Sequence, residues 1–455
     1  MKTADMRTQF ALLLASLAAA SLSSIAHAQD ALPADADTET TTFDSETRPD
    51  APADEPPPAA PAPAASTPPP VAPAAPPPVA PATPSVAVTA EPGRGLTVSM
   101  GDAFSGSIRA RLQVRATLRI DDDQVDTGIE IRTARLWWTG HVLHPDVRYG
   151  LQLALGANDF EPGNPSPIFD AFLELRQLRE LNVRIGQFFV PFDRARTIRE
   201  FALQTVDRTD VVRELTLDRD VGVVLQSTDF LGLGGALSYF LGVFGGDGRN
   251  RLGATPDAGL LYTARVSVRP FGGFDDDSEG DLARSPSPRL AIGAGFGFNH
   301  RSDRPRSTTG VPYQFARFDY AHLAGDLVFK WAGVSLLAEI VWRESTSGDF
   351  VEQTDADGQV TREYSRSGWG YLAQVGVMLH PMFEIWSRWE QLVAREGTDP
   401  ALVAQANERG HGLSAGANLY LHGHLLKVQA DWSHSFGDDF LVGAHVVRLQ
   451  LDASF

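Results

Sequence analysis

The chain has 455 residues, of which 39 are basic and 57 acidic, and it contains no cysteine. The missing cysteine excludes disulfide bonds and thiolate metal sites. Without the first 93 residues, which hold 3 basic and 11 acidic side chains, 36 basic and 46 acidic residues remain, and this net charge of −10 argues against a nucleic acid partner.

The first 28 residues resemble an export signal. Lys2 and Arg7 precede an apolar run over residues 10–22, and small residues follow up to Ala28. A membrane anchor is the alternative, but the apolar run is short and serines interrupt it. We therefore expect a cleaved signal peptide over residues 1–28 that takes the protein out of the cytoplasm.

Residues 29–93 form a low-complexity segment that is acidic at first and then rich in alanine and proline. Such a composition offers too little apolar side chain to balance the entropy of folding, and proline favours an extended chain. We expect a disordered linker on the periplasmic side. It is either a solvated spacer or an arm that reaches a periplasmic partner.

From residue 108 onward the dominant period of the sequence is two. Between residues 108 and 119 every even position is apolar and every odd position is polar or cationic, which is typical of a strand with one apolar and one wet face. Strong copies of this pattern follow at 147–156, 220–227, 262–269, 290–298, 334–343, 369–379, 412–421, 426–434 and 444–455. Weaker copies lie at 129–142, 169–176, 181–188, 236–244, 318–330 and around 383–390.

These segments predict an all-β fold, a transmembrane antiparallel β-barrel of about 16 strands over residues 94–455. Short periplasmic turns should alternate with long external loops, which we place at 120–128, 157–167, 189–218, 245–258, 299–316, 344–367, 392–410 and 436–443. The acidic stretch 271–288 is too long for a periplasmic turn. It is either an insertion or a sign that the predicted register slips by one hairpin.

The last strand carries the most specific pattern of the chain. Val447, Leu449 and Leu451 share one face with the terminal Phe455, and polar residues alternate with them. An amphipathic strand that ends on an aromatic residue resembles the C-terminal signal that the barrel-assembly machinery reads in outer-membrane proteins. Together with the signal peptide it predicts the bacterial outer membrane as the location and its lipid as the surroundings.

Four short motifs in order resemble the phosphate-selective porin O and P family: IGQFFVPF at 185–192, VDR at 206–208, DRDVG at 218–222 and GVFGGDG at 242–248. The resemblance implies a sixteen-stranded, trimeric anion channel whose external loops fold inward. It also places residues 189–218 where porins carry the constriction loop. We expect Arg194, Arg196, Arg199, Asp207 and Arg208 to set the charge there.

The charge inventory departs from that family, whose selectivity depends on lumenal lysine and arginine, because only two lysines lie beyond residue 93. Arginines take their place, and a guanidinium can bind phosphate or carboxylate through two hydrogen bonds. The candidate anion path is Arg109, Arg111, Arg115, Arg119, Arg135, Arg265, Arg269 and Arg388. Carboxylates such as Glu174 and Glu339 leave a second reading open, in which these arginines form salt-bridge ladders.

Three motifs of enzymes or metal sites fail on their context. The GLSAG at 412–416 lies within a strand pattern rather than at a strand-to-helix turn, and the DADG at 355–358 lacks carboxylates where a calcium loop needs them. His422 and His424 flank a glycine without a third ligand nearby. We therefore predict no enzyme activity, no cofactor and no metal.

The sequence favours a passive channel for small hydrophilic solutes, with phosphate among the candidates. The alternative is a structural barrel with an occluded lumen that tethers the envelope through residues 29–93.

Overall fold

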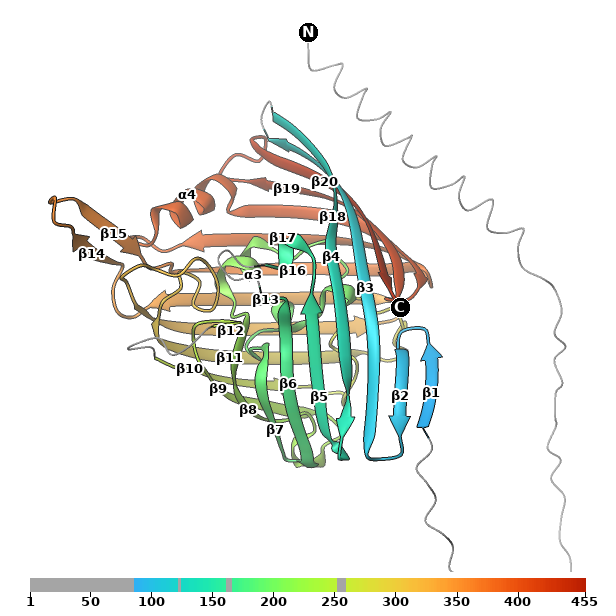
Figure 1. Cartoon of the computed structure of the whole chain (residues 1–455). Coiled ribbons are helices and arrows are strands. Elements are labelled where there is room, and N and C mark those ends of the chain that lie inside the picture. Colours follow the sequence, from blue (N-terminus) through green and yellow to red (C-terminus); the bar gives the residue numbers. More distant parts are fainter. Residues whose placement is uncertain (1–85, 122–123, 161–165, 252–258) are drawn as a thin grey trace, which may run out of the picture. The chain divides into compact units, whose positions relative to one another are not determined.

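The computed structural model describes residues 86–121, 124–160, 166–251 and 259–455, and a closed antiparallel β-barrel dominates them (Figure 1). Sixteen barrel strands are found within these ranges: β3 (Phe104–Asp121), β4 (Gln124–Val142), β5 (His144–Ala154), β6 (Ile168–Leu178), β7 (Leu181–Phe189), β8 (Arg219–Ser227), β9 (Leu237–Phe244), β10 (Leu261–Val268), β11 (Arg289–Ser302), β12 (Phe318–Trp331), β13 (Val334–Ser345), β16 (Gly368–His380), β17 (Phe383–Ala394), β18 (His411–His422), β19 (Leu426–Phe436) and β20 (Gly443–Ser454). Pairing of β20 with β3, from Ala444 opposite Asp121 to Ser454 opposite Arg111, closes the barrel. The predicted fold class is confirmed.

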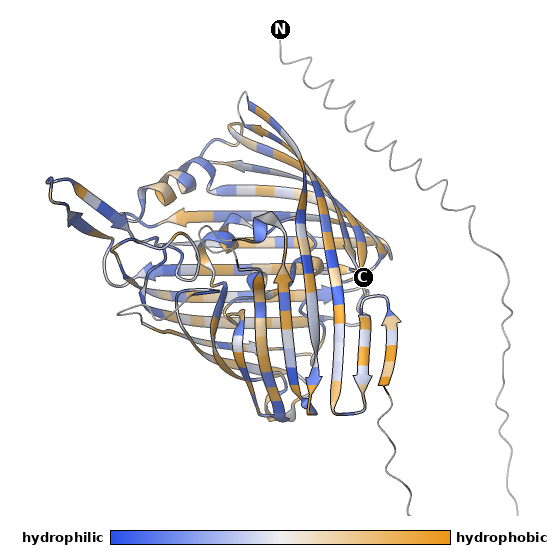
Figure 2. Ribbon diagram, viewed as in Figure 1, coloured by the Kyte–Doolittle hydropathy of each residue, from blue (hydrophilic) through white to orange (hydrophobic). Residues whose placement is uncertain are grey.

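The period of two sorts the side chains between the two faces of the barrel wall, as the alternating colours of the strands in Figure 2 show. Outward apolar side chains such as Ile129 and Ile340 are exposed on the wall, whereas the inward Arg343 and Lys427 are fully buried. An apolar outer face with a polar interior is the pattern of a barrel that is surrounded by lipid. Within the described ranges, no helix is both long and apolar enough to span a membrane.

The two ends of the barrel differ in their connections. At one end, here called the turn end, β4 and β5 are joined through Leu143, and β12 and β13 through Ala332 and Gly333, all with positive φ. The other end, the loop end, carries most of the long connections. One predicted long loop is wrong, because β3 extends to Asp121 and β4 begins at Gln124, so the loop expected at 120–128 is mostly strand.

A hairpin of β1 (Val86–Glu91) and β2 (Gly95–Met100) extends the wall at the barrel seam. Residues 96–99 of β2 pair with residues 105–108 of β3, on the edge that pairs with β20 from Arg111 onward. β3 is longer than β20, and the hairpin continues the sheet where β20 ends (Figure 1). The strand β1 thus lies inside the stretch that was assigned to the linker from sequence.

The long connection 269–288 at the turn end is an insertion and not a register slip. β10 and β11 pair without interruption from Val268 opposite Ile292 to Leu261 opposite Asn299. At the loop end, residues 346–367 carry a separate hairpin of β14 (Phe350–Thr354) and β15 (Val360–Tyr364), and α4 (Pro400–Arg409) lies between β17 and β18. The described residues also contain three short 3-10 turns, η2 (Ala157–Asp159), η3 (Glu200–Ala202) and η4 (Phe230–Gly232).

Candidate functional site

The connection between β7 and β8, here called the inward segment (residues 190–218), folds into the barrel. It contains α2 (Arg194–Thr197), η3 and α3 (Asp210–Leu215). The Asp193 side chain accepts a hydrogen bond from the backbone N–H of Arg196, and Thr209 accepts one from Val212, so both helices begin with a capping residue. Both helices therefore have defined starts within the segment that the sequence predicted to form the constriction.

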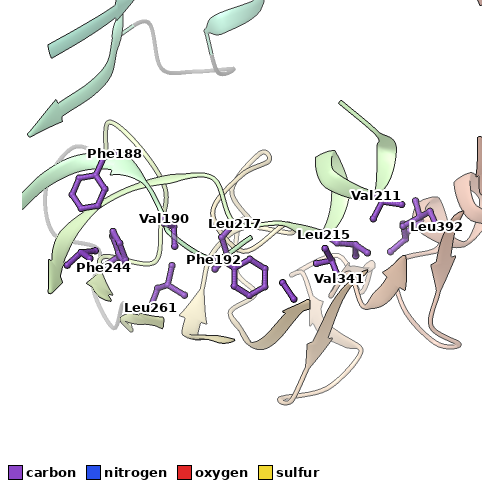
Figure 3. Packing of buried hydrophobic residues seen from close by; sticks show 13 residues of the cluster. Phe188, Val190, Phe192, Val211, Leu215, Leu217, Phe244, Leu261, Val341 and Leu392 are labelled. Carbon is purple, nitrogen blue, oxygen red and sulfur yellow. The ribbon is translucent and has the colours of Figure 1, made fainter. Parts of the chain in front are cut away.

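Apolar side chains anchor the inward segment to the wall. Val190, Phe192, Leu215 and Leu217 are fully buried and belong to one cluster with wall residues such as Val341 (Figure 3). Burial of a side chain of this size is worth about 1.5–3 kcal/mol. The anchoring explains why a loop of this length has a defined position.

Polar contacts with the wall hold the inward segment in its course across the lumen. The backbone N–H of Arg194 donates to Glu339 on β13 at 3.1 Å, and the Leu203 carbonyl accepts from Lys427 on β19 at 2.7 Å. Arg115 on β3 pairs with Asp207 at 3.2 Å. Because these partners come from distant parts of the wall, the segment divides the interior.

The insertion 269–288 enters the lumen from the turn end and meets the inward segment. The backbone N–H of Glu279 donates to the carbonyl of Ala202 at 3.1 Å, and the Glu279 carboxylate accepts from the backbone N–H of Gln204 at 2.7 Å. Asp276 pairs with Arg194 at 2.7 Å. Lys330 on β12 donates to Ser278 at 2.8 Å. Two segments from opposite ends thus touch inside the barrel, which the sequence did not indicate.

The four family-like motifs have different places in the structure. Residues 185–192, 218–222 and 242–248 meet at the loop end of β7, β8 and β9, where Phe188 lies opposite Asp220. The Asp220 carboxylate accepts from the backbone N–H of Gly246, which has a φ of +84° and no room for a Cβ beside Asn299. These three motifs therefore shape the place where the chain enters the inward segment. The fourth motif, with Asp207 and Arg208, lies within that segment.

Most arginines that the sequence placed on the anion path are held in ion pairs. The pairs on the wall are Arg111 with Asp452, Arg115 with Asp207, Arg119 with Asp121, Arg135 with Asp159 and Glu200, Arg265 with Asp326 and Arg269 with Asp276. In the inward segment, Arg194 pairs with Asp276 and Asp326, and Arg196 pairs with Asp218. Arg208 and Arg388 donate mainly to oxygens of the inward segment, among them the carbonyls of Ala195 and Asp207. Salt-bridge ladders, the second possibility that the sequence left open, thus describe much of this set of arginines.

Three hollows of about 560, 390 and 90 Å³ lie in the lumen toward the turn end, and Arg199 lines all three. Twelve arginines line them: Arg109, Arg111, Arg135, Arg148, Arg176, Arg184, Arg194, Arg199, Arg208, Arg219, Arg265 and Arg269. Against these stand the acidic side chains Asp170, Glu174, Glu200, Asp275 and Asp277 and the terminal residue Phe455. A chain of net charge −18 therefore encloses an arginine-rich space.

Three of these arginines, Arg109, Arg148 and Arg199, have no carboxylate partner in the described part of the chain. Arg199 lies 3.5 Å from the centre of the Trp137 ring, a cation–π contact. Burial, the largest effect, lowers the pKa of Arg199 to about 10, so this guanidinium remains charged at neutral pH. The sequence predicted Arg109 for the anion path and Arg199 for the constriction loop, but it did not indicate that these two lack a carboxylate partner.

Comparison with known proteins supports the fold. No protein-family profile matches the chain, and neither does any curated protein sequence compared with it. The outer membrane channel DcaP of Acinetobacter baumannii is 14% identical, with 78% of this chain and 98% of that chain covered and a TM-score of 0.50. OmpF of Salmonella typhi, in complex with daunomycin, is 12% identical, with 78% and 99% covered and a TM-score of 0.51. At these identities the likeness shows the fold alone, and the phosphate-selective family stays a prediction.

Proposed function

We propose that the protein is a bacterial outer-membrane porin, a passive channel for small hydrophilic solutes with a preference for anions. The observation that carries the proposal is the arginine-rich lumen of a chain that is acidic overall. A ring of cationic side chains attracts anions into a pore and repels cations. The export signal predicted from the sequence, the apolar outer wall and the terminal Phe455 support the outer membrane as its place, and passage needs no chemical step.

The reversal potential across a planar bilayer tests this proposal. With the folded protein in a tenfold gradient of potassium chloride, we expect a potential of the sign that chloride permeation produces. The same measurement in potassium phosphate shows whether phosphate also permeates. A potential of the opposite sign would overturn the anion preference.

Phe455 should be needed for efficient insertion into the membrane, and we propose that it serves as the signal for the barrel-assembly machinery. Its backbone N–H and carbonyl both pair with Ala110 on β3, at 2.9 and 2.7 Å, while the residue as a whole is 66% exposed. Deletion of Phe455 should lower the amount of folded protein in outer membranes, measured by the shift in gel mobility on heating. An unchanged amount would contradict this role. The same gels, run without heating, also test the proposed homotrimer.

A structural barrel with an occluded lumen is the second candidate. The contact of Glu279 with Ala202 and Gln204 favours it, because two segments from opposite ends close part of the lumen. This candidate predicts no conductance from the pure folded protein. It also predicts that deletion of residues 30–84 weakens attachment of the outer membrane to the rest of the envelope.

A further inference from the structure

We propose that Arg199, Arg109 and Trp137 form a binding site for a small carboxylate that carries a flat apolar ring. This inference rests on the proposed channel function and names the class of solute that the lumen selects. The site lies on the turn-end side of the inward segment, where the three hollows share Arg199.

Three separate elements bring the cationic groups together. Arg109 lies on β3, Trp137 on β4 and Arg199 on the inward segment between α2 and η3. The guanidinium of Arg199 lies 3.5 Å from the centre of the Trp137 ring, and that of Arg109 lies 4.9 Å from it. Both charges therefore share one aromatic platform, which fixes their position relative to the lumen.

The hydrogen-bonding capacity of the site is largely unused. Apart from its contact with the Trp137 ring, the Arg109 guanidinium donates one hydrogen bond, of 3.3 Å, to the Gly93 carbonyl. The buried indole N–H of Trp137 has no hydrogen-bond partner in the described structure. A buried donor without a partner is unfavourable, and a ligand oxygen would remove that penalty. A carboxylate fits because its two oxygens only accept hydrogen bonds.

The acidic side chains around this site are bound to other arginines. Glu200 lines the smallest hollow, but it pairs with Arg135 at 2.7 Å. Glu174, in the 390 Å³ hollow, pairs with Arg184 at 2.6 Å and also with Arg176. Asp170, which lines the largest hollow together with Arg199, pairs with Arg219 at 2.7 Å. These acidic side chains are therefore bound to other arginines, and the charges of Arg109 and Arg199 remain available.

Apolar walls beside the cations favour a ligand that has an apolar part as well as a negative charge. Phe189, Phe201 and Leu425 line the smallest hollow together with Arg109 and Arg199. A binding site with apolar walls and a few placed polar groups suits an organic ligand. Inorganic phosphate and acetate would meet the same charges without gaining from these walls. The combination favours a carboxylate on an aromatic ring, for which benzoate is the simplest probe.

Block of the chloride current in planar bilayers tests the site with the full folded chain. We expect benzoate to block at a lower concentration than acetate or phosphate. Arg199→Gln should raise the half-blocking concentration of benzoate about tenfold, the equivalent of about 1.4 kcal/mol. Trp137→Phe keeps a ring and removes the N–H, and should raise it by a smaller factor. Arg362→Gln, on β15 outside the lumen, is the matched control and should change nothing.

The outcomes separate the binding site from the channel function. Equal block by benzoate, acetate and phosphate, or an equal response of Arg199→Gln and Arg362→Gln, overturns the site while an anionic reversal potential still supports the channel. A cationic reversal potential overturns the channel preference itself. If the wild-type protein does not conduct, calorimetric titration of benzoate into the folded protein in detergent makes the same comparison. No difference between wild type and Arg199→Gln there also overturns the site.

Discussion

Replacing residues 272–288 with the turn Asn-Gly is expected to raise the single-channel conductance about twofold or more, because the exchange empties part of the lumen. The ends of the insertion suit a tight turn, because Val268 lies opposite Ile292 and the same register, continued toward the turn end, puts residue 271 opposite residue 289. A two-residue turn can therefore join them without moving β10 or β11. The exchange also frees Gln204 and Arg194 from their contacts with Glu279 and Asp276.

A matched deletion separates this effect from a general disturbance of the barrel. Removing residues 355–358 shortens the β14–β15 hairpin, which lies in a sheet separate from the barrel wall. That variant should conduct like the wild type in the same bilayers. If the exchange of 272–288 leaves the conductance at the wild-type level while the protein is folded, the insertion does not narrow the pathway.

The same experiment decides between the two candidate functions. If the wild type conducts and the exchange raises its conductance, the insertion restricts an open pore. A silent wild type that begins to conduct after the exchange has an insertion that closes it. In both cases, the contact between Glu279 and Ala202 is the one that a smaller change in the insertion should target next.

The barrel could be predicted because its signals are local. The period of two and the tight turns, such as the one at Ala332 and Gly333, are properties of neighbouring residues. Strand ends were less certain, since pairing with the neighbouring strand β4 extended β3 to Asp121, beyond the local pattern. The hairpin of β1 and β2 was missed because its strands are short and follow a proline-rich stretch directly.

The state of most arginines could not be predicted, because their partners are far away in the sequence. Arg111 pairs with Asp452 from the last strand, and Arg265 pairs with Asp326 on a strand that is not its neighbour. The inward course of residues 269–288 depends on the same kind of contact. Acidic composition marked this stretch as unusual, but only its contacts with buried side chains show where it lies: Lys330 donates to Ser278, and Arg194 pairs with Asp276.

The largest loss of stability from a single exchange is expected for Glu214→Gln. Glu214 on α3 is 2% exposed and pairs with Arg306, Arg343 and Arg366 at 2.7–2.9 Å. Arg343 is fully buried on β13, so removing its carboxylate leaves an uncompensated charge inside the protein. Breaking a buried ion pair on one side costs about 3–5 kcal/mol. Denaturant unfolding followed by tryptophan fluorescence should show that loss in the free energy of unfolding.

A second exchange of the same type serves as the control. Glu352→Gln removes a carboxylate that pairs with Arg362 at 2.8 Å on the exposed β14–β15 hairpin. Exposed pairs contribute about 0–1 kcal/mol, so this variant should unfold like the wild type. Equal unfolding free energies for both variants would show that the cluster around Glu214 does not hold the inward segment.

The pH dependence follows from the same cluster. Burial acts to raise the pKa of Glu214, but the guanidiniums of Arg343, Arg366 and Arg306 outweigh it and lower this pKa from 4.5 to about 2. Because the pKa is lower in the folded state, the ionised Glu214 stabilises the fold fully above about pH 4.5, and this contribution is lost as the pH falls toward 2. The difference in unfolding free energy between wild type and Glu214→Gln should therefore be constant from pH 7 to 5 and shrink below it. A difference that does not change between pH 5 and 2 would assign the stability of α3 to the apolar contacts of Leu215 and Val211 instead of the ion pairs.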